Sequence, residues 1–315
     1  MTRRGWTLFL ALALIWGIPY LLIKVAVREL SPASLVFLRT ALGAALLLPA
    51  ALARGGLGAL LPRWRPIVAF TVAELVVPWF LLADVERRVP SSLAGLSVAS
   101  VPTVGALIAL ASGARERIGP RRAAGMAVGV AGVAALLGLD LGGADPLAWL
   151  ELLVVVAGYA WAPQVVAREL SDVPALDVVT ASVALCALVY APAGIAGLVA
   201  APPGMDALLA VAALGAICTA LAFLLFFRLI AEVGPLRATL ITYLNPAVAV
   251  LAGVAFLGER VTAGTAAGFV LILAGTWLAT GGQRAAPAAT PGTRPGTSAP
   301  LDARSPARPA ARAAG

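Results

Sequence analysis

Apolar stretches alternate with short polar connections along almost the whole chain, from residue 6 to residue 280. At about 1.5 Å per helical residue, each stretch is long enough to cross a hydrocarbon layer roughly 30 Å thick. Because the connections are short, neighbouring helices must run antiparallel. The pattern therefore predicts an all-α integral membrane protein with ten transmembrane helices. The expected spans are Trp6–Val27, Ala33–Ala53, Pro66–Ala83, Ser91–Ala111, Arg122–Leu139, Leu147–Ala167, Ala175–Ala200, Ala207–Phe227, Leu236–Leu257 and Thr262–Thr280.

The second half of the chain repeats the first, and residues Leu96–Leu136 align with Leu240–Ala279. Landmarks of the two copies coincide at offsets of 143 or 144: Pro102 with Pro246, Glu116-Arg117 with Glu259-Arg260, Gly125 with Gly268, and Gly132 with Gly275. A unit with an odd number of spans, followed by its copy, enters the bilayer in the opposite sense. We therefore expect two inverted five-helix repeats, residues 1–140 and 141–282, that enclose a polar pocket at mid-bilayer.

Composition excludes several classes of protein. Hydrophobic residues make up 61% of the chain and charged residues only 12%, with a mean hydropathy of +0.97. A soluble domain has about one-quarter charged residues. The chain has no histidine, and its cysteines, Cys186 and Cys218, fall inside apolar stretches. A histidine-cysteine metal site, an imidazole-dependent active site and a disulfide framework are therefore excluded, and we expect no metal, no cofactor and no enzymatic activity.

The basic residues indicate how the chain is oriented. A sequence pI of about 10.7 is typical of nucleic-acid-binding proteins, but most of these residues lie in short loops between apolar spans. If the N-terminus is inside, 17 of the 23 lie on that side, and only Arg28, Arg87, Arg88 and Arg260 lie outside. Positive charge accumulates on the cytoplasmic side of membranes. We therefore expect both termini in the cytoplasm and no nucleic-acid partner.

The two ends of the chain differ in character from the spans between them. Thr2-Arg3-Arg4 resembles an export signal, but the apolar run that follows continues past any cleavage point, so we interpret it as the first membrane anchor. Residues 283–315 are rich in Ala, Pro and Arg, with almost no large apolar side chains. This composition predicts a disordered cytoplasmic tail, whose arginines have anionic lipid heads as potential partners.

Charged residues within the spans are the main candidates for function, because each costs about 2.5–3.5 kcal/mol at the centre of a membrane helix. Lys24, Arg39 and Glu151 lie near span ends, where a side chain can reach outward. Glu74 lies in mid-span on a short stem, so we expect it to face a cavity and to bind a cationic group or a proton. The alternative is a structural ion pair with Lys24 or Arg39.

Aromatic residues and prolines add further candidates. Trp16, Tyr20 and Lys24 recur every four residues and share one helix face, which favours a cavity wall, although packing is the alternative. Prolines interrupt matching spans of both halves, an arrangement typical of a central binding site. The pairs are Pro19 with Pro163 and Pro102 with Pro246, and the polar or aromatic residues beside them are Trp161, Gln164, Tyr243 and Asn245.

One small-residue motif bears on oligomeric state. Gly125 and Gly129 form a GxxxG step, which permits close helix contact within the chain or in a homodimer.

These residues resemble the EamA family of the drug/metabolite transporter superfamily. The resemblance rests on Trp16-Gly17, then Lys24, Pro32 and Arg39, and in the second copy on Asn245-Pro246 followed by the stretch Leu257–Thr262. It covers about residues 6–280. The first copy departs from the pattern, with Ala114-Arg115-Glu116 where the second copy has Leu257-Gly258-Glu259. The resemblance implies a ten-helix transporter of the inner cell membrane, often an exporter of amino acids or other small metabolites.

Together these features predict a secondary transporter, expected to export small polar metabolites such as amino acids or drugs by alternating access, with proton coupling through Glu74 as an option. Lys24 and Arg39 would attract an anionic group and Glu74 a cationic one, a combination that suits a zwitterion. A carrier of nucleotide-sugars or lipid-linked head groups is the alternative within this architecture. An integral-membrane enzyme and a channel are alternatives of other classes. The sequence lacks a nucleotide-binding G-x-x-x-x-G-K-[ST] motif.

Overall fold

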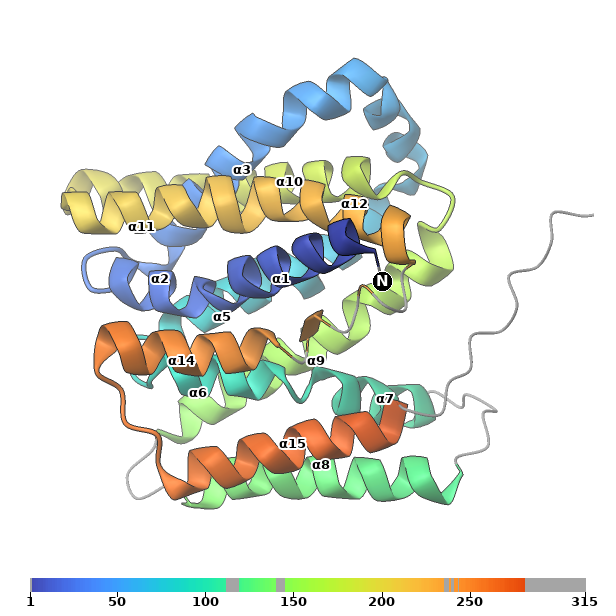
Figure 1. The fold of residues 1–315 in the computed structure, drawn as a ribbon. Coiled ribbons are helices and arrows are strands. Elements are labelled where there is room, and N and C mark those ends of the chain that lie inside the picture. The colour runs from blue at the N-terminus through green and yellow to red at the C-terminus, as the bar shows by residue number, and fades with distance from the viewer. Residues whose placement is uncertain are drawn as a thin grey trace, which may run out of the picture. The chain divides into compact units, whose positions relative to one another are not determined.

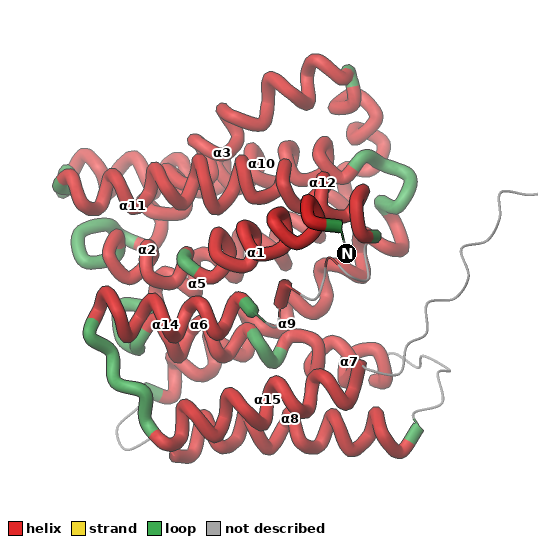
Figure 2. The backbone as a smooth tube through the Cα atoms, in the orientation of Figure 1, coloured by secondary structure: helices red, strands yellow, loops and turns green. Residues whose placement is uncertain are grey.

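The computed structural model describes residues 2–111, 119–139, 145–234, 238, 241–242 and 244–280, and these form helices joined by short turns (Figures 1 and 2). The α-helices are α1 Arg3–Gly17, α2 Pro19–Ala26, α3 Pro32–Arg54, α4 Trp64–Thr71, α5 Val77–Val85, α6 Ser91–Val98, α7 Val101–Ala111, α8 Pro120–Leu139, α9 Pro146–Glu169, α10 Ala175–Ala200, α11 Met205–Gly215, α12 Ala222–Val233, α14 Asn245–Leu257 and α15 Ala263–Thr280. The 3₁₀ helix η1 spans Gly56–Arg63, and the π-helical turns η2 and η3 span Val72–Val76 and Ala216–Leu221.

Six continuous helical stretches of the described residues are long and apolar enough to cross a membrane: Arg3–Ala26, Pro32–Arg54, Leu60–Val85, Pro146–Glu169, Ala175–Ala200 and Met205–Val233. They correspond to the first three predicted spans of each half. The remaining four predicted spans are shorter or interrupted helices, namely α6 with α7, α8, α14 and α15. The prediction of an all-helical membrane protein with ten spans is confirmed.

Successive spans run in opposite directions, as the colour gradient of Figure 1 shows. The start of α1 and the end of α15 therefore lie at the same end of the helices, which we call the terminal end, and the opposite end is called the loop end. The first span of the second half, α9, runs opposite to the first span of the first half, α1–α2. The two halves are thus inverted relative to each other, as the odd number of spans in each copy requires.

Helix packing follows the same symmetry. The corresponding helices α3 and α10, α8 and α15, and α6 and α14 pack directly against each other. The first span contacts α11 and α12 of the eighth, and the third span contacts α9 of the sixth, which are the same contact with the two halves exchanged. Such a pattern is expected when a twofold axis relates the two repeats.

The GxxxG step of α8 is used inside the chain. A Cβ atom built on Gly275 of α15 would lie 2.7 Å from the carbonyl oxygen of Gly125 and would also meet the backbone of Gly129. Only glycine permits so close an approach of two backbones. This face of α8 is therefore occupied by α15.

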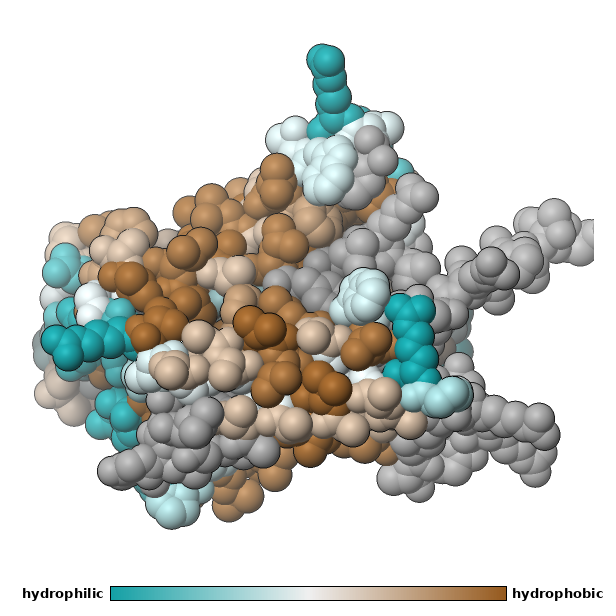
Figure 3. All heavy atoms as spheres, turned by 60° about the horizontal axis from the view of Figure 1, so that its bottom comes forward, coloured by the Kyte–Doolittle hydropathy of each residue, from teal (hydrophilic) through white to brown (hydrophobic). Residues whose placement is uncertain are grey.

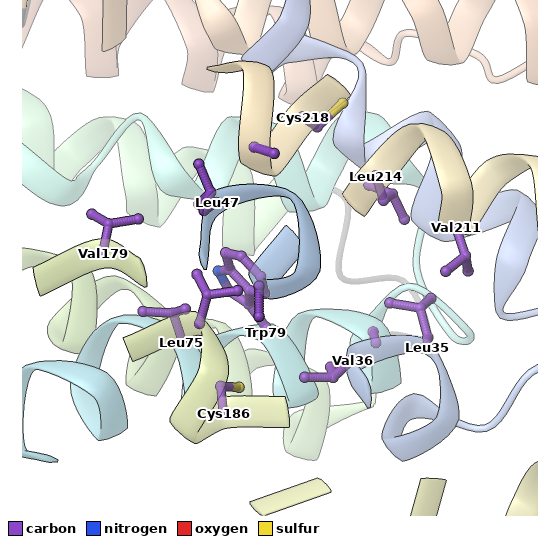
Figure 4. Packing of buried hydrophobic residues seen from close by; sticks show 14 of the residues in the cluster. Leu35, Val36, Leu47, Leu75, Trp79, Val179, Cys186, Val211, Leu214 and Cys218 are labelled. Atoms are coloured by element: carbon purple, nitrogen blue, oxygen red, sulfur yellow. The ribbon is translucent and has the colours of Figure 1, made fainter. Parts of the chain in front are cut away.

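The largest buried cluster lies where α3, η2, α5, α10, α11 and η3 meet (Figure 4). Its members include Leu75, Trp79 and the free thiols Cys186 and Cys218. The outer face of the helices, in contrast, carries large exposed apolar side chains, and hydrophobic residues fill the middle of the face in Figure 3. An apolar surface of this kind is what a lipid environment requires.

Candidate functional site

Two π-helical turns mark corresponding positions of the two repeats. Turn η2 begins at Val72 and η3 at Ala216, an offset of 144 residues that matches the repeat. In the first copy Pro78 lacks an N–H group, and in a regular α-helix its ring would clash with the carbonyl of Glu74 one turn earlier, which the widened turn avoids. In the second copy the Thr219 hydroxyl donates a 2.8 Å hydrogen bond to the Leu214 carbonyl five residues back. Single π-helical turns within α-helices are frequent at functional sites.

Arg39 of α3 is a buried cation whose described partners are all uncharged. Its side chain is only 7% exposed, and its Nε donates a 3.1 Å hydrogen bond to the Thr219 hydroxyl of η3. The guanidinium carbon lies 3.5 Å from the centroid of the Trp79 ring. Within the described residues, no carboxylate forms an ion pair with Arg39. A buried charge without a counter-ion is costly, so this guanidinium is a candidate for binding an anionic ligand group.

Glu74 lies on the widened turn η2 with one carboxylate oxygen, Oε2, buried and without a hydrogen-bond partner in the described part of the chain. It forms no ion pair with Lys24 or Arg39, both of which are described. The alternative of a structural ion pair is therefore not what the structure has. The hydroxyl of Tyr159 on α9 lies within electrostatic reach of both Glu74 and Arg39.

Close packing by glycine places the two tyrosines of this region. Gly158 lets α9 approach η2 and α5, since a Cβ atom there would meet the carbonyl oxygen of Ala73 in η2 and, at 3.1 Å, Pro78 of α5. The next residue is Tyr159. On the other side the ring of Tyr20 lies over Gly95, with 3.2 Å to a Cβ built there. Tyr20 and Tyr159 both pack on the small buried cluster around Leu82.

We refer to this set as the central site. Both repeats contribute to it, and its members are Tyr20 of α2, Arg39 of α3, Glu74 of η2, Trp79 of α5, Tyr159 of α9 and Thr219 of η3. The sequence singled out Tyr20, Arg39 and Glu74, whereas Trp79, Tyr159 and Thr219 were missed. The repeat itself gave one signal for Thr219. The 144-residue offset makes Cys218, the neighbour of Thr219, the residue that corresponds to Glu74 in the second copy.

Lys24 lies at the loop end rather than in the central site. Its Nζ donates hydrogen bonds to the carbonyl oxygens of Glu86 at 2.5 Å and Val89 at 2.9 Å, which follow the C-terminus of α5. Lys24 also lines a hollow of about 320 Å³ together with Arg28, Arg88, Val89, Pro90, Leu257 and Glu259. The ammonium group is therefore turned toward helix-terminal carbonyls instead of reaching straight outward, a favourable place for a cation.

The other sequence candidates do not converge on the central site. Trp16 packs on Phe223 and Phe226 of α12, with ring centroids 5.8 and 4.9 Å apart. Trp161 is 43% exposed and shares a face of α9 with the exposed Leu147, Leu150 and Val154.

Of the three remaining candidates, one bonds within its own helix, one has a buried unpaired oxygen, and one lies outside the described residues. Gln164 Nε2 donates to the Ala160 carbonyl of its own helix at 3.1 Å. Asn245 begins α14, with its Oδ1 buried and unpaired among the described residues. Tyr243 lies outside the described residues, as does the Glu116-Arg117 pair.

Ionic contacts join the two repeats at the loop end. Arg88 forms ion pairs with Asp84 at 2.6 Å, with Asp145 at 2.5 Å and with Glu151, so one guanidinium links α5 to the start of α9. The Glu259 carboxylate accepts hydrogen bonds from the backbone N–H groups of Ser91 at 2.7 Å and Ser92 at 2.9 Å. Glu259 therefore caps the N-terminus of α6, where Pro90 has no side-chain donor or acceptor.

Replacing Glu259 with alanine is expected to destabilise the folded protein by about 1–2 kcal/mol, because α6 loses its cap. Burial by itself raises the pKa of Glu259, but the hydrogen bonds from Ser92 and Ser91 outweigh it and lower that pKa below its ordinary value. A lowered pKa stabilises the fold above the ordinary pKa of about 4.3, and this contribution is lost as pH falls through the lowered value. Thermal unfolding in detergent at neutral and acidic pH measures the difference.

The matched control is Arg260→Ala, which removes the adjacent exposed charge. Equal melting temperatures of wild type and Glu259→Ala at neutral pH would contradict the capping role.

Comparison with known proteins shows which transporter family the sequence resembles. The model of the EamA-like transporter family matches residues 3–138 and again residues 148–281. The chain is similar to the protein described as "Uncharacterized inner membrane transporter YedA" of Escherichia coli strain K12, with 28% identity over 263 residues, 80% of this chain and 82% of that protein. The protein of the same description from E. coli O157:H7 gives the same values.

A solved structure supports the fold independently. The structure titled "Crystal structure of protein" superposes with a TM-score of 0.61 at 24% identity, covering 89% of this chain and 97% of that one. Together, the duplicated family match and the two packed sets of five spans show that this chain belongs to the EamA-like transporter family.

Proposed function

We propose that this protein is a secondary transporter that exports small zwitterionic metabolites, such as amino acids or drugs of similar charge, by alternating access. The observation that carries the proposal is a pair of ionisable side chains in the central site that have no ion partner among the described residues. Among the described residues, Arg39 has only Thr219 and Trp79 as direct partners, and Glu74 has a buried oxygen without a partner. A ligand with one negative and one positive group would satisfy both charges.

In this proposal the Arg39 guanidinium binds the carboxylate of the substrate in a bidentate manner, a geometry that lysine does not offer. Glu74 receives the ammonium group, or a proton when the site is empty of substrate. Trp79, Tyr20 and Tyr159 form apolar walls that exclude water, and the Tyr159 hydroxyl lies within electrostatic reach of both charges. Because both repeats contribute residues, tilting of one repeat against the other exposes the site to one side or the other.

The distribution of arginines supports an orientation in the membrane, and the relatives support a location. The excess of arginine at the terminal end, where Arg63 and Arg168 lie, supports cytoplasmic termini. The inner-membrane relative supports a multi-pass protein of the inner cell membrane. The loop end, with Arg28, Arg87 and Arg88, would then face away from the cytoplasm. The Gly125–Gly129 face already packs on α15, so a homodimer would need another surface.

Counterflow in proteoliposomes, with a metabolite panel and with or without a pH gradient, tests the proposal. Zwitterionic amino acids are expected to exchange saturably. Nucleotide-sugars in the same panel test the alternative carrier, and exchange of those compounds alone would refute the proposal. Ohmic single-channel currents in planar bilayers would favour a channel instead.

A further inference from the structure

Glu86, the first residue after α5, has a side chain without any exposed surface, although it stands in the charged sequence Asp84-Val85-Glu86-Arg87-Arg88. Both of its carboxylate oxygens are buried, and neither has a hydrogen-bond partner in the described part of the chain. Its backbone is engaged, since its N–H donates to the Leu82 carbonyl at 3.0 Å and its carbonyl accepts from Lys24 Nζ. No pattern in the sequence distinguishes this glutamate from the surface residues beside it.

The charged and titratable groups that face Glu86 come from three neighbouring elements. Lys24 and Tyr20 belong to α2, Arg39 to α3, and Glu259 to the turn after α14. Of these groups, Lys24 has the strongest electrostatic effect on the Glu86 carboxyl group. However, two of the three N–H groups of Lys24 are donated to backbone carbonyls, and it forms no ion pair with the Glu86 carboxylate. The Glu259 carboxylate is held by the N-terminus of α6 and adds a second negative charge nearby.

This environment favours the neutral carboxyl group. Burial raises the pKa of Glu86 well above its ordinary range, and the opposing effect of Lys24 does not cancel it. A carboxylate buried without hydrogen bonds is far more costly than a carboxylic acid in the same place. The hollow lined by Lys24, Val89 and Glu259 lies beside this position and is the route by which water would reach it if the loop end opened.

We propose that Glu86 is a proton-binding site of the transport cycle, with its carboxyl group protonated while the loop end is closed and ionised while that end is open. On opening, the O–H bond breaks, the proton passes to water on the loop side, and the carboxylate pairs with Lys24 Nζ as the carbonyls of Glu86 and Val89 release it. Closing reverses these steps and takes up one proton from the same side. The proposal rests on alternating access and adds Glu86 as a proton-binding residue that is separate from Glu74.

The test is the accessibility of a cysteine in the hollow, which requires no substrate. Val89→Cys is introduced with Cys186→Ala and Cys218→Ser, and its labelling rate with a membrane-impermeant maleimide is measured from pH 5 to pH 8. The rate is divided by that of Ala201→Cys, an exposed position at the same end, to remove thiol ionisation. We expect the ratio to rise with pH, by at most about tenfold per pH unit, the limit for one linked proton.

In a Glu86→Gln background the ratio is expected to stay low and independent of pH, because the amide cannot ionise. Glu29→Gln, at the same end, serves as the matched control and should keep the response, since an amide oxygen can still accept the Gly204 N–H. A ratio that is flat in the parent protein, or that rises equally with Glu86→Gln, would overturn the proposal. If the parent protein shows the labelling response but no counterflow of zwitterionic amino acids, the result counts against the proposed substrate class and not against the role of Glu86.

If Glu86→Gln does not fold, infrared spectroscopy of Glu86→Asp decides the question. A protonated carboxyl band that moves relative to the parent protein supports a neutral Glu86, and a spectrum without such a shift contradicts it.

Discussion

Replacing Arg39 with glutamine is expected to abolish counterflow of zwitterionic substrates while leaving folded protein in the membrane. The substitution removes the one buried guanidinium that binds the substrate carboxylate in the proposed site, where it is supported by Thr219 and Trp79. Loss of a buried charge-assisted contact costs about 2–4 kcal/mol, which corresponds to roughly 30- to 900-fold weaker binding. Binding is measured by thermal-shift titration, alongside transport in proteoliposomes.

Arg39→Lys is the matched variant, because it keeps the charge but loses the planar, bidentate group. We expect Arg39→Lys to be folded like the wild type and to bind substrate more tightly than Arg39→Gln but more weakly than the wild type. Size-exclusion profiles and melting temperatures report whether each variant is folded. Unchanged substrate affinity in a folded Arg39→Gln protein would remove Arg39 from the binding site.

The second large effect is expected for Glu74→Gln, which should also abolish transport of zwitterionic substrates without preventing membrane insertion. Glutamine has nearly the same volume and still fits the widened turn η2, so the change removes the negative charge alone. Loss of one charged hydrogen-bond partner costs about 1.5–3 kcal/mol, or roughly 10- to 150-fold in affinity for the ammonium group. Uptake with and without a pH gradient distinguishes a substrate contact from a proton carrier.

Glu74→Asp keeps the charge and serves as the control. It should retain measurable transport with altered affinity, because the shorter stem moves the carboxylate without neutralising it. Full transport by Glu74→Gln would exclude Glu74 from both proposed roles.

The overall architecture was accessible from the sequence because it depends on one-dimensional features. Span lengths follow from runs of apolar residues, and the inversion follows from an odd number of spans per repeat. Local breaks were harder to predict. The fourth span is divided at Ala99-Ser100, between α6 and α7, and the π-helical turn η2 depends on how Pro78 displaces the carbonyl of Glu74.

The central site was only partly accessible. Arg39 and Glu74 stand out because charges are rare in apolar spans, and that signal is present in the sequence itself. Thr219 and Tyr159 are ordinary residues until the second repeat packs against the first and brings them to Arg39 and Glu74.

Trp161 became a candidate because it lies close to Pro163 in the sequence, yet the structure places it away from the central site. Proximity to a proline does not reveal which face of a helix is exposed, whereas the exposed residues Leu147, Leu150 and Val154 of α9 show that Trp161 lies on the outer face. Glu86 was missed because a charged loop sequence gives no indication that one of its side chains turns inward.

The central claim is that one buried site, built from both repeats, recognises a zwitterion through opposite charges on Arg39 and Glu74. The most direct test is counterflow of three forms of the best amino acid from the panel: the free zwitterion, its cationic amide and its anionic N-acetyl derivative. We predict exchange of the zwitterion by the wild type, a relative preference for the amide in Arg39→Gln, and a relative preference for the N-acetyl form in Glu74→Gln. Equal exchange of all three forms by the wild type, or the same preference in both variants, would contradict the account.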